Sequence, residues 1–154
     1  MTYECTVVEQ PAQPTLQIRL RVPAQDMTLV LEDAYGALKE CLAELGEEPA
    51  GPPFAAYPNQ NTQNLEVAVG FPVSHPIRNQ GGIKAGEILA GKYASCLHTG
   101  PLGELATAYR ELAQWVAREG YQSTSPAYEF YPDDPANTPP HELRTRIMVP
   151  LTTP

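Results

Sequence analysis

Apolar and polar residues follow two different periods along this chain, and each period occurs twice. Apolar residues recur at helical spacing over residues 31–45 and again over 102–116, which predicts two amphipathic helices. Apolar and polar residues alternate over residues 65–72 and 143–150, which predicts strands with one face toward a core. Further strands are expected over residues 3–8, 16–22 and 87–98.

Residues that begin and end helices flank both helical stretches. Asp26 and Thr99 are candidates for the N-cap, and Pro101 suits a first helical turn. Gly46 and Gly120 suit the left-handed position that follows a helix. We expect residues 74–85, which contain a Gly-Gly pair, to connect the two sets of elements.

The two sets of elements form an internal repeat. Residues 34–38 and 108–112 share an Ala-Tyr pair followed by a leucine, and they lie 108 − 34 = 74 positions apart. The same offset relates Tyr57 to Tyr131. The later strands lie 143 − 65 = 78 positions apart, so the second copy has four extra residues before its last strand.

This repeat predicts the fold class. Each half has the order strand, helix, strand, strand, with the halves at about residues 1–73 and 86–151. Neither half can bury its apolar face alone, so we expect the two to pack with pseudo-twofold symmetry. The expected fold is a single α+β domain over residues 1–154, with an antiparallel sheet and two main helices.

Composition and charge narrow the classes of function. The net charge is −8 and the isoelectric point is near 4.8, which argues against direct binding of nucleic acid. The N-terminus does not resemble a signal peptide, and no apolar run is long enough to span a membrane, so we expect a cytoplasmic protein. Cys5, Cys41 and Cys96 are widely spaced, and reduced thiols are expected there.

Candidate chemistry is concentrated in one segment. The chain carries no standard catalytic motif, and its histidines, His75, His98 and His141, are isolated. We therefore predict neither a metal site nor a cofactor. Residues 128–132 read Tyr-Glu-Phe-Tyr-Pro, with Glu129 and Tyr131 on one face of a strand.

In the first half the matching segment reads Phe-Ala-Ala-Tyr-Pro, so Ala55 replaces Glu129 while the tyrosine is kept. A carboxylate among aromatic rings loses hydration, which favours binding of a cation. Aromatic faces add a cation–π attraction of roughly 0.5–2 kcal/mol per contact. The alternative is that Glu129 is an exposed strand residue beside aromatic side chains of the core.

Several short motifs, taken in order, resemble the GyrI-like small-molecule-binding domain family. This family includes effector-binding domains of AraC-type and MerR-type regulators such as Rob and BmrR. The resemblance is strong over residues 85–151 and weaker before them. The matching motifs are Gly-Lys-Tyr-Ala at 91–94, His-Thr-Gly-Pro-Leu at 98–102, and Pro-Ala-Tyr-Glu-Phe-Tyr at 126–131.

The resemblance implies a cleft between the halves, in which a buried glutamate among aromatic rings meets cationic, lipophilic drugs. The position of Glu129 in its motif assigns that role to Glu129. Tyr131 follows from strand geometry and Tyr57 from the repeat. Other candidates for the wall of the cleft are Tyr93, Phe71 and Trp115, of which Trp115 fits core packing equally well.

Three functions stay open at this point. The chain lacks the helix-turn-helix of the regulators, so it reads as a standalone member of the family. It could bind lipophilic, cationic small molecules, or it could hydrolyse strained cyclopropane-type electrophiles with Glu129 and Tyr93 or Tyr131 as acid and base. It could also inhibit a protein partner through its acidic surface. A haem-carrier role is disfavoured, since no histidine has the context of an axial ligand.

Overall fold

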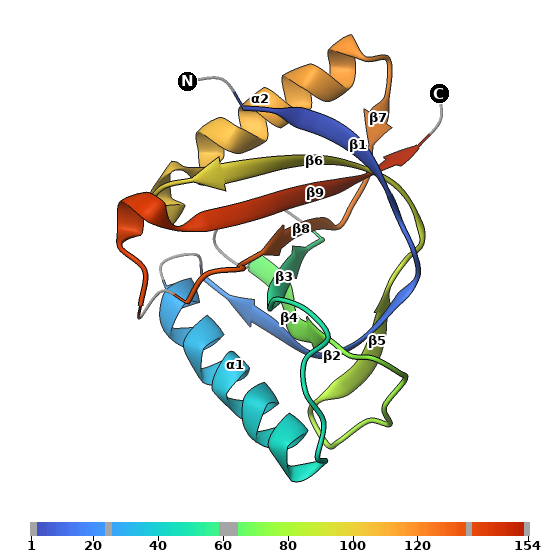
Figure 1. Cartoon of the computed structure of the whole chain (residues 1–154), viewed down its shortest axis with the longest axis vertical. Helices are drawn as coiled ribbons and strands as arrows, with labels where there is room; N and C mark the ends of the chain where they lie inside the picture. Colours follow the sequence, from blue (N-terminus) through green and yellow to red (C-terminus); the bar gives the residue numbers. More distant parts are fainter. Residues whose placement is uncertain (1–2, 24–25, 59–64, 135–136, 153–154) are drawn as a thin grey trace. The chain divides into compact units, whose positions relative to one another are not determined.

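The structure is a computed structural model that describes residues 3–23, 26–58, 65–134 and 137–152 (Figure 1). These residues form two compact units. We call them the N unit, Pro11–Ala90, and the C unit, Met1–Gln10 with Gly91–Pro154. Each unit combines one main helix with antiparallel strands, so the fold is α+β as the sequence predicts.

In the C unit, a long helix packs against antiparallel strands. Its elements are β1 (Cys5–Gln10), β6 (Gly91–Thr99), η2 (Leu102–Glu104), α2 (Leu105–Arg118), β7 (Gln122–Ser123), β8 (Ala127–Phe130), η3 (Pro140–Glu142) and β9 (Arg144–Thr152). The strand order is β1-β6-β9-β8, and β7 pairs with β9. Figure 1 shows α2 (orange) running beside β1 and β6, and α2 packs on β6.

The N unit repeats this arrangement. Its elements are β2 (Gln13–Val22), α1 (Met27–Glu44), β3 (Phe54–Tyr57), β4 (Leu65–Pro72) and β5 (Lys84–Ile88). The strand order is β5-β2-β4-β3, which matches β1-β6-β9-β8 of the C unit position by position. The helix α1 packs on β2 and β4. The duplicated strand-helix-strand-strand order is therefore confirmed.

Strand register confirms both offsets of the repeat. Ala55 pairs with Val69, and Glu129 pairs with Ile147. The third strands of the two copies are therefore related by 129 − 55 = 74, and the last strands by 147 − 69 = 78. The offset of 78 also relates β2 to β6. Residues of β3 thus have their equivalents in β8 at an offset of 74, and residues of β2 and β4 have theirs in β6 and β9 at an offset of 78.

The two copies exchange their edge strands. β1 comes just before β2 in the chain, yet it pairs with β6. β5 comes just before β6, yet it pairs with β2. The boundaries of the compact units therefore differ from those of the sequence repeat. The units divide the chain after Gln10 and after Ala90, whereas the two copies of the repeat cover residues 1–73 and 86–151.

Matching stripes of the two helices form the cores. The buried residues at equivalent positions are Ala34, Leu38 and Leu42 in α1, and Ala108, Leu112 and Val116 in α2. Their spacing places each set on one side of its helix. Of the helices in the described ranges, none has the length and apolar character needed to cross a membrane.

Both helices end as the sequence predicts. Gly46 and Gly120 have φ angles of +70° and +80°, which a residue with a side chain rarely adopts. The amide that follows each glycine donates a hydrogen bond to a carbonyl five residues earlier, at 2.9 Å and 3.1 Å. These bonds form a Schellman motif at the end of each helix.

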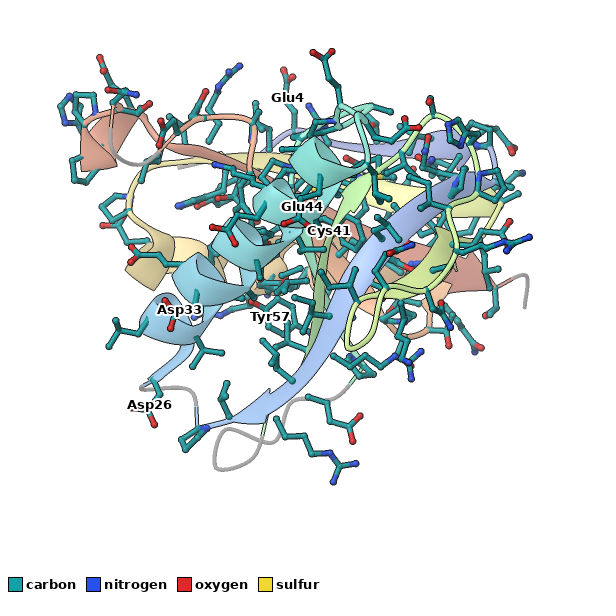
Figure 2. The ribbon with its side chains drawn as sticks, turned by 90° about the horizontal axis from the view of Figure 1, so that it is seen from below. Glu4, Asp26, Asp33, Cys41, Glu44 and Tyr57 are labelled. Carbon is teal, nitrogen blue, oxygen red and sulfur yellow. The ribbon has the colours of Figure 1, made fainter. Side chains whose placement is uncertain are left out.

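The starts of the helices differ from the sequence prediction. Asp26 occupies the N-cap of α1, where Figure 2 labels it, but its side chain makes no capping hydrogen bond. The prediction of Thr99 as an N-cap is wrong, because β6 continues through Thr99 and α2 follows Glu104. Pro101 precedes the short helix η2, and its carbonyl accepts a hydrogen bond from the Glu104 amide at 3.0 Å.

The strand expected over residues 87–98 is also different, because it is two strands. β5 ends at Ile88 and β6 begins at Gly91, with Leu89 and Ala90 between them. The two strands pair in different units, β5 with β2 and β6 with β1, so the chain leaves the pairing of one unit before it joins that of the other. The apolar residues Ile88, Leu89 and Ala90 run across this break and conceal it.

Gly70 lies where two strands approach closely, and we expect Gly70→Ala to destabilise the protein by about 1–3 kcal/mol. A methyl group at this position would meet the carbonyl oxygen of Leu16 at 2.4 Å and the ring of Phe54 at 3.0 Å. The backbone carbonyl cannot move away without disturbing the pairing of β2 with β4. Chemical denaturation of both proteins measures the loss.

Gly36 provides the matched control for this prediction. It lies inside α1, and a methyl group there would meet no atom within 4 Å. Gly36→Ala should therefore stabilise the protein by up to about 1 kcal/mol, through helix propensity alone. Equal effects of the two substitutions would contradict the close approach at Gly70.

Candidate ligand-binding site

A carboxylate is buried between the helix and the sheet of the C unit. Glu129 lies in β8, opposite Ile147 of β9, and only 7% of it is exposed. Ile147 also pairs with Cys96, and both pack against Leu112 of α2 in one apolar cluster. Because paired residues point to the same face of a sheet, the Glu129 side chain is on the side that α2 covers.

Two tyrosine hydroxyls hold this carboxylate. Tyr109 of α2 donates a hydrogen bond to Oε2 of Glu129 at 2.5 Å. Tyr131 donates to Oε1 at 2.7 Å, and it shares a face with Glu129 because it lies two residues further along the chain. Each carboxylate oxygen therefore has its own phenol donor, which fixes the orientation of the group.

Burial and these two hydrogen bonds act on Glu129 in opposite directions. Loss of hydration raises the pKa of the carboxyl group, and the hydrogen bonds from Tyr109 and Tyr131 lower it. Burial is the larger effect, so the pKa of Glu129 lies above its usual 4.5. None of the ion pairs among the described residues includes Glu129. Its charge is thus held by neutral donors.

The equivalent place in the N unit is built differently. Ala55 replaces the glutamate and is fully buried. Tyr35 is the counterpart of Tyr109, and its hydroxyl donates to the backbone carbonyl of Phe54 at 2.6 Å. The helix tyrosine is therefore kept in both units, while its acceptor has changed from a backbone carbonyl to a carboxylate.

Three other aromatic residues of the C unit, Tyr93, Tyr128 and Phe130, lie on the opposite face of its sheet. Tyr93 is next to Ala94, which belongs to the cluster under α2, so Tyr93 points away from α2. It meets Tyr128 edge to face, with ring centroids 6.2 Å apart, and Tyr128 stacks on Phe130 at 6.2 Å. Burial raises the pKa of Tyr128 to about 12. Tyr93 is thus not brought beside Glu129.

The remaining predicted residues have separate surroundings. Trp115 packs against the apolar cluster of the C unit, which favours its interpretation as a core residue. Phe71 is buried in β4 and meets the Tyr35 ring edge to face at 5.8 Å. Tyr57 ends β3 and is partly buried (labelled in Figure 2). Of the six predicted residues, Glu129 and Tyr131 are joined by a hydrogen bond, and the expected cleft stays a prediction.

Tyr109 is a site residue that sequence reasoning missed. The helical spacing placed it in the apolar stripe of α2 together with Leu112. A tyrosine inside a buried stripe needs an acceptor for its hydroxyl, and this was the available signal. Of the carboxylates in predicted strands, Glu129 is the nearest to Tyr109 in the sequence.

His98 is a structural residue, as the sequence suggested. Its Nδ1 lies 3.0 Å from the hydroxyl of Tyr3, and its Nε2 lies 3.1 Å from the carbonyl oxygen of Pro101. Both ring nitrogens therefore have partners. Within the residues that the structure describes, no three His, Cys, Asp or Glu side chains gather to hold a metal ion.

Solved structures similar to this chain include EcmrR bound to DNA and the C-terminal domain of EcmrR alone. A chain of the EcmrR–DNA complex in EcmrR-RPo is 26% identical, with a TM-score of 0.88, and the match covers 100% of this chain and 59% of that one. The EcmrR C-terminal domain is 25% identical, with a TM-score of 0.80 and full coverage of both chains. This chain therefore spans about three fifths of the longer EcmrR chain.

A more distant structure shares the fold alone. SAV2435 bound to tetraphenylphosphonium is 12% identical, with a TM-score of 0.67, and the match covers 99% of this chain and 94% of that one. No curated protein matches the sequence. A family model described as the GyrI-like small molecule binding domain matches residues 3–152. The chain therefore belongs to the GyrI-like small-molecule-binding domain family.

Proposed function

We propose that this protein binds lipophilic cations at Glu129 and thereby senses or sequesters such compounds. The observation that carries the proposal is a carboxylate that is 7% exposed, held by Tyr109 and Tyr131, and without an ion-pair partner among the described residues. A buried charge of this kind is costly until an opposite charge reaches it. A cationic ligand supplies that charge, and apolar bulk replaces water around it.

The two phenols make the site ready for a cation. They hold the carboxylate in one orientation, so little rotational freedom is lost on binding. They also favour its ionised form, because each donates a hydrogen bond to a carboxylate oxygen. The tetraphenylphosphonium on SAV2435 supports this class of ligand, and the likeness to a domain of DNA-bound EcmrR supports a sensing role. The hydrolase alternative relies on the same carboxylate and stays a prediction.

Titration calorimetry with tetraphenylphosphonium tests the proposal. We expect saturable binding to the wild-type protein and a loss of at least about tenfold in affinity for Glu129→Gln, which keeps the size of the side chain and removes its charge. Glu119→Gln is the matched control. It removes the same charge from an exposed residue at the end of α2, where solvent and salt screen it, so affinity should stay within about twofold of wild type.

The two variants separate local recognition from the overall field of an acidic protein. Equal losses in Glu129→Gln and Glu119→Gln would mean that only the net charge of −8 attracts the cation. If Glu129→Gln binds tetraphenylphosphonium with the same affinity as the wild-type protein, the proposal is wrong. A thermal melt of each variant confirms that the comparison is made between folded proteins.

A further inference from the structure

On the face of the C unit's sheet that α2 covers, polar residues break the repeat at three positions. Each of these positions is apolar in the N unit and polar in the C unit, at the offsets that strand register establishes. The three pairs are Ala55 and Glu129, Val67 and Thr145, and Leu20 and His98. Three coincident changes of this kind distinguish one copy of the repeat from the other.

These three polar residues lie on one face of the sheet. His98 pairs directly with Thr145, and Thr145 is two residues before Ile147, the partner of Glu129. Thr145 and Glu129 are therefore diagonal neighbours on adjacent strands, on the side that α2 covers. Diagonal neighbours have backbones roughly 7–8 Å apart, within reach of a shared ligand.

Thr145 is fully buried, and its hydroxyl has no hydrogen-bond partner among the residues that the structure describes. The neighbouring polar groups have partners of their own: both nitrogens of His98 are in contact with other groups, and the Tyr131 hydroxyl donates to Glu129. Packing does not need the hydroxyl either, because Val67 fills the equivalent position of the N unit with 2% exposure. Buried polar groups are almost always satisfied, so this one requires an explanation.

We propose that the Thr145 hydroxyl is a second recognition point of the site, and that the ligand is a cation carrying a hydrogen-bonding group beside its charged centre. This inference rests on the proposed function, since the charged centre is the one that meets Glu129. A hydroxyl both donates and accepts, so it suits a ligand hydroxyl, carbonyl or amide. A buried polar group without a partner discriminates against ligands that cannot pair with it.

A matched set of phosphonium ions tests this inference. The probes are tetraphenylphosphonium and its three derivatives with one hydroxyl at the ortho, meta or para position of one ring. We expect at least one derivative to bind the wild-type protein about five- to tenfold more tightly than the parent ion, as one additional hydrogen bond would provide. Thr145→Val should abolish this advantage, so that no derivative binds this variant more tightly than the parent ion does, and Thr145→Ser should restore the advantage.

The outcomes separate this inference from the proposed function. If the parent ion binds through Glu129 but no derivative gains an advantage that depends on Thr145, the second recognition point is wrong and the proposed function stands. If the parent ion does not bind, or binds without Glu129, both fail. A Thr145→Val protein that melts well below wild type would show that the hydroxyl already has a partner in the free protein, and this result would also overturn the inference.

Discussion

Replacing Ala55 by glutamate is expected to lower the free energy of unfolding by about 3 kcal/mol or more at pH 8. This substitution copies Glu129 into the equivalent position of the N unit. Ala55 is fully buried, and the nearby helix tyrosine, Tyr35, already donates its hydroxyl to the carbonyl of Phe54. The new carboxylate would therefore lack the donor that Tyr109 provides to Glu129.

Ala55→Gln is the control, since it adds the same volume without the charge. Both variants should suffer from crowding, and the difference between them should come from the buried charge. A buried carboxyl group that lacks donors has a higher pKa in the folded protein than in the unfolded chain. Lowering the pH therefore protonates it and reduces the destabilisation that its charge causes. Urea denaturation at pH 8 and pH 5 should show that the free energies of unfolding of the two variants become similar at the lower pH.

Convergence would show that the charge, and not the size of the side chain, is what this strand position does not tolerate when Tyr35 already donates its hydroxyl elsewhere. A glutamate at position 55 that costs no more than glutamine at pH 8 would contradict that view. It would mean that the strand position itself accepts a charge. The Tyr109 and Tyr131 hydrogen bonds would then be incidental to the burial of Glu129.

Local patterns in the sequence predicted the elements of the fold well. The buried stripes of α1 and α2 follow from helical spacing, and the endings at Gly46 and Gly120 follow from the residue that most readily adopts a positive φ. These features depend on neighbours within about five residues. The offsets of the repeat could be measured for the same reason, because each matched motif is short and local.

Features that depend on distant residues could not be predicted. Nothing near β1 indicates that it pairs with β6, more than 80 residues further on, instead of with β2. Thr99 has the chemistry of an N-cap, but its pairing with Arg144 keeps it in β6. Strand pairing overrides a local preference of this size, since a cap contributes only about 1 kcal/mol.

The candidate site shows the same division. Strand alternation placed Glu129 and Tyr131 on one face, and both lie there. Alternation could not tell which face Tyr93 shares, because that depends on its register with β9 and on the side that α2 covers. Tyr109 escaped notice because its partner lies 20 residues away, across a turn and a change of element.

The raised pKa of Glu129 makes proton release part of ligand binding, and this gives a prediction with a defined sign. The folded protein holds the proton of Glu129 more tightly than the unfolded chain does. The contribution of this group to stability is therefore complete below the unfolded pKa, near 4.5, and is lost as the pH rises through the folded pKa. Between the unfolded and the folded pKa, the free energy of unfolding of the wild-type protein should fall by up to about 1.4 kcal/mol per pH unit relative to that of Glu129→Gln.

Affinity for a cation should change in the opposite direction. Only the ionised carboxylate attracts tetraphenylphosphonium, so affinity should rise by up to about tenfold per pH unit below the pKa of Glu129 and level off above it. Glu129→Gln should show no such rise. Calorimetry in two buffers with different ionisation enthalpies should detect the released proton below the pKa and no proton above it. An affinity that is flat with pH in the wild-type protein would contradict this linkage.

The tyrosines provide the sharpest form of this test. The hydrogen bond from Tyr131 lowers the pKa of Glu129, so removing it in Tyr131→Phe should raise that pKa further. The midpoint of the affinity rise must then move to higher pH, because the carboxylate needs a higher pH to ionise. A residue that only lined the site would change the affinity at all pH values and leave the midpoint in place. A shifted midpoint would therefore show that the Tyr131 hydroxyl sets the pKa of Glu129. Tyr109→Phe should shift the midpoint in the same direction.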